Sequence, residues 1–116
     1  MSTKPHNRAT AKRRPQPAPI FAALGDETRL SLVVRLSAGQ PHSISQLTRG
    51  TRLTRQAISK HLRVLENAGI VRSTHSGREN RFQLDPKPLL TVQQYLNSVS
   101  RQWDQTLDRL KSFVED

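Results

Sequence analysis

The sequence predicts a small, mainly α-helical domain that carries one β-hairpin. The chain has 116 residues, which suffice for one hydrophobic core and no more. From Ile20 onward apolar residues recur at helical spacing, and the period changes to strand-like alternation only after Gly69. We therefore expect one domain over residues 20–116. Residues 1–19 contain four prolines and no apolar periodicity, which predicts a disordered basic arm.

Start and stop signals place the first helices. A short apolar stripe over residues 20–24 ends at Gly25, and Asp26 is a favourable N-cap for the next helix. That helix ends before Gly39 and Pro41, and its expected inward residues are Leu30, Val33, Val34 and Leu36. Ser45 is expected to cap a short helix, and Thr54 to cap a longer one that terminates at Gly69. Two helices joined by a short turn form a helix-turn-helix pattern.

The second half of the chain predicts a hairpin and a long helix. A strand opens at Ile70, residues 75–78 indicate a turn, and residues 81–84 alternate polar and apolar side chains. Asp85 followed by Pro86 marks the start of the last helix. Its apolar stripe from Leu89 to Val114 covers roughly 39 Å. Such a helix either belongs to an ordinary core or, as its length favours, pairs with its copy in a homodimer.

Charge and composition limit the function classes. The formal net charge is +10, and the basic residues concentrate in residues 1–19, with five basic and no acidic residues, and in residues 49–81, with eight basic against two acidic residues. This distribution favours a face that binds a polyanion. The absence of cysteine excludes disulfides, thiolate metal sites and a cysteine nucleophile. With no membrane-length apolar run, no phosphate-binding loop and no catalytic set, we expect a cytoplasmic protein that is not an enzyme.

Three segments together resemble one known family. The segments ALGDETRL (residues 23–30), LTRQAISKHLRVLENAGIV (residues 53–71) and GRENRFQL (residues 77–84) are similar to the ArsR-type winged helix-turn-helix family. The resemblance implies a homodimeric regulator of transcription that binds double-stranded DNA, usually a repressor released by an inducer, and dimerises through its terminal helices. The implied interface comprises apolar residues of both terminal helices: Phe21, Leu24, Leu89, Val92, Leu96, Val99, Trp103, Leu107 and Leu110.

Metal sensing is not expected. The family's thiolate sensor would require cysteines near residues 43–47, where this chain has SISQL. The other common sensor requires His and carboxylates along the last helix, and residues 86–116 contain no His. The segments DPKPL (residues 85–89), YL (residues 95–96), RQW (residues 101–103) and LDRL (residues 107–110) resemble a metal-free subgroup of the family. We expect neither a metal nor another cofactor.

The resemblance also places the DNA contacts. The helix that begins at Thr54 would enter the major groove, where Arg suits guanine and Gln suits adenine. We assign Arg55 and Gln56 to bases, Ser59 and Lys60 to bases or phosphate, and Thr54 to the N-cap and a phosphate. His61 either packs inside or contacts DNA.

The remaining expected contacts are basic or amide side chains of the turn and the wing, the hairpin tip over residues 75–81: Arg49, Arg52, Arg78, Asn80 and Arg81. Arg52 replaces the Gly or Asn usual in the family, so either it adopts the left-handed conformation or the turn is recast. Glu79 would be repelled by phosphate unless it pairs with a neighbouring Arg. The alternative function is a basic architectural or RNA-binding protein without sequence preference.

Overall fold

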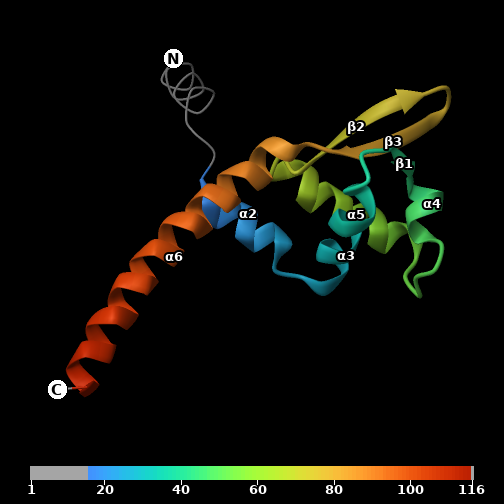
Figure 1. Cartoon of the computed structure of the whole chain (residues 1–116). Coiled ribbons are helices and arrows are strands. Elements are labelled where there is room, and N and C mark those ends of the chain that lie inside the picture. Colours follow the sequence, from blue (N-terminus) through green and yellow to red (C-terminus); the bar gives the residue numbers. More distant parts are fainter. Residues whose placement is uncertain (1–15, 116) are drawn as a thin grey trace, which may run out of the picture.

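The computed structural model describes residues 16–115, which contain five helices and three strands (Figure 1). In chain order these elements are α2 (Pro17–Leu24), α3 (Glu27–Leu36), β1 (His42–Ser43), α4 (Ile44–Thr48), α5 (Arg55–Asn67), β2 (Val71–Ser76), β3 (Glu79–Leu84) and α6 (Pro86–Glu115). The helix-turn-helix expected from the sequence is formed by α4 and α5. Residues 1–15 of the predicted arm lie outside the described residues.

Helix α2 begins earlier than predicted. Its first residue is Pro17, so the last three residues of the expected arm, residues 17–19, belong to the helix. Prolines are tolerated there because the N–H groups of a first helical turn have no intrahelical partner to lose. The prolines at 17 and 19 therefore start a helix that the sequence interpretation excluded.

Hydrogen-bonded caps fix the starts of the next three helices. Asp26 accepts from the backbone N–H of Arg29 at the start of α3, and Thr54 accepts from the N–H of Ala57 at the start of α5. The prediction of Ser45 as the cap of α4 is wrong, because Ser43 forms a reciprocal capping box with Gln46. Ser43 has the extended backbone that an N-cap requires, whereas residue 45 already lies inside the helix.

The strands form one antiparallel sheet in the order β1-β3-β2. The hairpin is longer than predicted, because β2 continues to Ser76 and pairs there with Glu79. Its two-residue turn therefore consists of Gly77 and Arg78, and Gly77 has a φ of 64°. Gly at the first of two central positions suits the twist of a tight hairpin. Strand β1 was not predicted and pairs His42 with Phe82.

A single hydrophobic core joins the helices to the base of the hairpin. Its buried apolar members come from every long element: Ile20, Ala23, Leu32, Val33, Leu36, Leu47, Ile58, Leu62, Leu65, Ile70, Val71, Phe82 and Val92. The prediction that Leu30 and Val34 face the core is wrong, because they are 50% and 64% exposed, while Leu32 is buried. Helix α3 packs against α5 and β3, and this contact turns Leu30 and Val34 toward solvent.

Helix α6 leaves the core after its first turns. Its start at Pro86 is confirmed, and the Asp85 side chain accepts from the N–H of Lys87. Only Pro88 and Val92 of this helix are buried. Figure 1 shows α2 alongside the first half of α6 and the C-terminal half of α6 projecting away from the other elements. Val92 therefore belongs to the core of one chain, which corrects its assignment to a dimer interface. Among residues 16–115, no helix has both the length and the apolar character needed to cross a membrane.

Candidate nucleic-acid interface

One side of α5 presents polar side chains to solvent from the start of the helix. Arg55, Gln56 and Lys60 are exposed, and Thr54 is exposed at the cap. The opposite side carries Ile58 and other buried apolar residues of the core, so the helix cannot rotate without exposing them. Ser59 is half-buried and thus less accessible than expected from the sequence.

The tip of the hairpin and the start of α5 line one hollow of about 230 Å³. Its lining comes from the end of β1, α4, α5 and the wing: Ser43, Ile44, Ser45, Arg55, Arg78, Glu79 and Asn80. Arg55, Arg78 and Asn80 were predicted independently to contact DNA, and the fold brings them around one hollow. The cap residue Ser43 joins β1 to α4 and so fixes this end of α4 against β3.

Within the wing, Arg81 forms a solvent-exposed ion pair with Glu79. Its Nη2 donates to Oε1 of Glu79 at 3.4 Å, and its side chain is only 41% exposed. The Nε atom of Arg81 is buried and has no hydrogen-bond partner within the described residues. Arg81 is therefore less free to contact DNA than Arg78 or Asn80.

The turn between α4 and α5 takes its left-handed residue from Gly50. Gly50 has a φ of 79°, and among residues 16–115 positive φ occurs only at glycines. Arg52 therefore does not adopt the left-handed conformation, which decides between the two alternatives left by the sequence. Arg49 and Arg52 are both exposed in or beside this turn.

Arg35 of α3 fixes the C-terminal end of α4. Its guanidinium donates to the carbonyl of Leu47 at 2.6 Å, to that of Gln46 at 2.8 Å and to that of Arg49 at 3.4 Å. These carbonyls lack partners inside so short a helix, and Arg35 supplies them. The sequence interpretation missed this role, for which the only signal was a basic residue in the last turn of an apolar helix.

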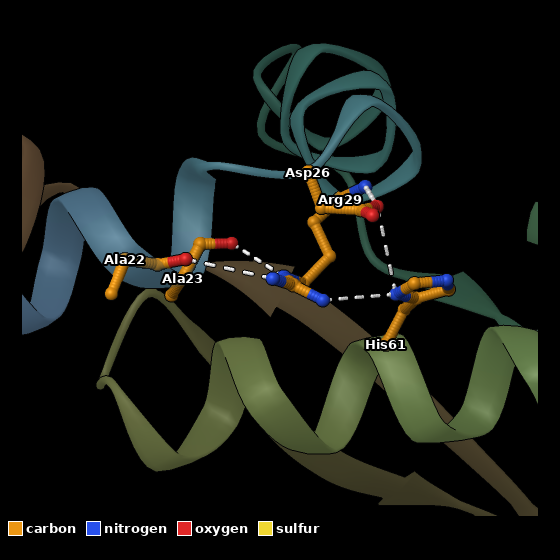
Figure 2. Close-up of polar contacts among 5 residues, drawn as sticks. All are labelled: Ala22, Ala23, Asp26, Arg29 and His61. Atoms are coloured by element: carbon orange, nitrogen blue, oxygen red, sulfur yellow. Dashed lines mark hydrogen bonds and ion pairs between the residues drawn. The ribbon is translucent and has the colours of Figure 1, made fainter.

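A second arginine connects α2, α3 and α5 (Figure 2). The Nε of Arg29 donates to the carbonyl of Ala23, and its Nη2 donates to the carbonyl of Ala22. Its Nη1 lies 3.3 Å from Nδ1 of His61. The same Nδ1 atom of His61 lies 3.8 Å from Oδ2 of Asp26. Arg29 thus caps the end of α2 while contacting α5.

This network decides the placement of His61. The side chain is 24% exposed and directed at Arg29 and Asp26, so the structure favours packing over DNA contact. Arg29 can donate to Nδ1 only when that nitrogen carries no proton. The backbone N–H of Arg29 donates to the Asp26 carboxylate and lowers the pKa of Asp26 below its ordinary value.

The distal part of α6 exposes an apolar stripe, which we define as Leu96, Trp103, Leu107 and Leu110. Their exposed fractions are 50%, 59%, 55% and 55%. The half-buried Leu24 and Leu89 pack against the core, and Val99 is also half-buried. Phe21 of α2 contacts Tyr95 of α6, with ring centroids 5.9 Å apart. The expected dimer residues thus divide between inner ones that support the domain and an outer stripe that no residue between 16 and 115 covers.

Comparisons with known proteins agree with this architecture. Residues 24–74 match the family model described as a helix-turn-helix domain. The HTH-type transcriptional regulator Rv2034 of Mycobacterium tuberculosis is 35% identical over 99 residues, which cover 85% of this chain and 89% of that protein. An ArsR-like transcriptional regulator from Rhodococcus sp. RHA1 has 36% sequence identity and a TM-score of 0.70, covering 84% of this chain and 91% of that one.

The chain belongs to the ArsR-type winged helix-turn-helix family. A further solved structure, a possible transcriptional regulator for arsenical resistance, is 34% identical with a TM-score of 0.64 and covers 79% of this chain and 92% of that one. This ArsR-type regulator has the winged helix-turn-helix fold predicted from its sequence, with α4 and α5 as the helix-turn-helix and β2-β3 as the wing. Among its described residues, no three His, Asp or Glu side chains gather as a metal site.

Proposed function

We propose that this protein is a homodimeric repressor that recognises an inverted repeat in double-stranded DNA. The observation that carries the proposal is the shared hollow, around which the start of α5 and the wing tip place Arg55, Arg78 and Asn80. A helix in the major groove contacts base edges with its N-terminal residues, and a wing beside it reaches the minor groove or the flanking phosphates.

The exposed side of α5 supplies the contacts to bases. Arg55 can donate two hydrogen bonds to guanine, and Gln56 can both donate to and accept from adenine. Lys60 lies one turn further along and is exposed, which suits a base or a phosphate. The half-buried Ser59 is limited to short-range contact. His61 supports α5 from inside through Arg29 and contributes no base contact.

Phosphate contacts surround this base-recognition region. Arg49 and Arg52 are exposed beside the turn, and Thr54 caps the helix whose first N–H groups favour an anion. Arg78 extends the positive surface to the wing, where Arg81 contributes once a phosphate replaces Glu79 as its partner. Phosphate contacts of this kind make the affinity fall as salt rises.

Dimerisation would give the protein its symmetric target. The exposed stripe of α6 is apolar over several turns, as the seam between two paired helices requires. A two-fold axis through paired α6 helices would present two copies of α5 to half-sites about 34 Å apart. Repression then follows if bound dimer blocks the promoter, as the family resemblance implies.

A competition gel shift tests the proposed function. The probe is the duplex immediately upstream of this protein's own coding sequence, titrated at fixed salt with excess random-sequence duplex. A complex that persists against the competitor, and a footprint over an inverted repeat, support the proposal. A complex that random duplex displaces as readily as the probe itself contradicts recognition of that site, and a preference for RNA would favour the architectural or RNA-binding alternative. A transcription assay with the same duplex then distinguishes a repressor from an activator.

A further inference from the structure

Glu79 is an acidic residue within the most basic surface of the described chain. Residues 49–81 contain two acids, and the other, Glu66, accepts from the Ser73 hydroxyl at 2.8 Å in the last turns of α5. Glu79 instead lines the hollow together with Arg55 and Arg78. Its position at the wing tip therefore places a carboxylate where the proposed function requires close approach to DNA.

The structure gives this carboxylate only a weak partner. Its Oε1 lies 3.4 Å from Nη2 of Arg81, and the two side chains are 53% and 41% exposed. Ion pairs this open to solvent contribute little and are readily exchanged. A DNA phosphate could therefore take Arg81, but it would then leave the Glu79 carboxylate without its partner.

The chemistry of the carboxylate makes that exchange depend on the DNA sequence. An ionised carboxylate only accepts hydrogen bonds, and phosphate oxygens offer no donor. Base edges do offer donors, namely the amino groups of cytosine and adenine in the major groove and that of guanine in the minor groove. A site with an amino group at the correct position compensates the carboxylate, whereas a random site does not.

We infer that Glu79 is a specificity-determining residue, which disfavours binding through phosphates alone and is compensated only on the correct site. The inference rests on the proposed function and adds to it a residue that weakens binding to the wrong DNA. In this role the Glu79–Arg81 pair withholds one positive charge from random duplexes.

The test compares Glu79→Gln with wild type on two probes, a duplex enriched by wild-type protein from a random-sequence library and an unselected random duplex. In 0.1 M salt, one additional phosphate contact raises affinity by up to about eightfold. We expect E79Q to bind the random duplex about three- to eightfold more tightly, with a salt slope steeper by about one. Affinity for the selected duplex should change less, so the ratio between the two affinities falls.

Two further variants control the result. Glu66→Gln makes the same change of charge at an exposed residue of α5 that lies outside the hollow, and it should leave both affinities nearly unchanged. Adding Arg81→Gln to E79Q should abolish the gain on random duplex, because the released guanidinium is then absent.

The outcomes distinguish a failure of the role of Glu79 from a failure of the proposed function. An equal rise on both probes, or no rise on random duplex, overturns the role of Glu79 while leaving the proposed function intact. A wild-type protein that enriches no duplex and shows no preference overturns the proposed function itself, and the role of Glu79 with it. Equal effects of E79Q and E66Q would show that the gain depends only on the net charge of the protein, and would also overturn the role of Glu79.

Discussion

Replacement of Trp103 by Ala should separate the proposed dimer into monomers. Trp103 lies in the exposed stripe of α6, and 59% of its surface is open within one chain. It lies beyond the part of α6 that is buried in the core, which ends at Val92. The substitution therefore removes apolar surface from an interface and not from the folded domain.

The exposed area of Trp103 sets the magnitude. With roughly 200 Å² for a Trp side chain, the 59% exposed fraction corresponds to about 120 Å². At about 25 cal/mol per Å², full burial contributes about 3 kcal/mol per protomer and about 6 kcal/mol per symmetric dimer. Since about 1.4 kcal/mol changes an equilibrium tenfold, the dissociation constant should rise by up to about four orders of magnitude.

Sedimentation velocity over a range of protein concentrations measures this effect. Wild type should sediment as a dimer at low micromolar concentration and W103A as a monomer, with unchanged circular dichroism. The control is Gln102→Ala, which alters an exposed polar side chain of the same helix turn and should remain dimeric. A W103A protein that is still dimeric at low micromolar concentration would refute pairing through the α6 stripe.

Three further perturbations test other parts of the account. Arg55→Ala should weaken binding to a selected duplex by about 1–3 kcal/mol, and an equal loss on random duplex in anisotropy titrations would argue against base recognition. Arg35→Gln removes charged hydrogen bonds to the carbonyls of Gln46 and Leu47, so it should cost about 2 kcal/mol and lower the melting temperature by roughly 8–16 °C. Calorimetry checks this, and an unchanged melting temperature contradicts the role. The pKa of Asp26 is lowered in the folded protein, so its ionised form adds stability above its ordinary pKa, and that stability is lost as the pH falls through the lowered value. Asp26→Asn keeps a capping oxygen but not the charge, and its urea midpoint should fall less than that of wild type over this acidic range; identical pH profiles would disprove the linkage.

The sequence predicted the elements whose signals are local. The caps at Asp26 and Thr54, the terminator at Gly69 and the start of α6 at Pro86 each depend on a few neighbouring residues. The existence of strand β1 could not be predicted from the sequence, because the two residues His42 and Ser43 form a strand only through pairing with β3. Without β1, the sequence interpretation also placed the α4 cap two residues late.

Burial and long-range contacts were harder to predict. Leu30 and Val34 share a helical stripe in the sequence, yet which side of α3 is buried depends on where α5 and β3 lie. The roles of Arg29 and His61 likewise arise from residues 32 positions apart in the chain. Periodicity therefore identified α5, while the contacts that fix its orientation could be seen only in the fold.

Hydrogen–deuterium exchange of the protein with and without a selected duplex tests most directly which face binds DNA. We expect DNA to slow exchange in the first turns of α5, over residues 54–61, and at the wing tip, over residues 76–81. Residues 96–110 of α6 should exchange at the same rate with and without DNA, because the stripe faces the partner subunit in both states. Protection confined to α6, with no change in α5 and the wing, would contradict the proposed nucleic-acid interface.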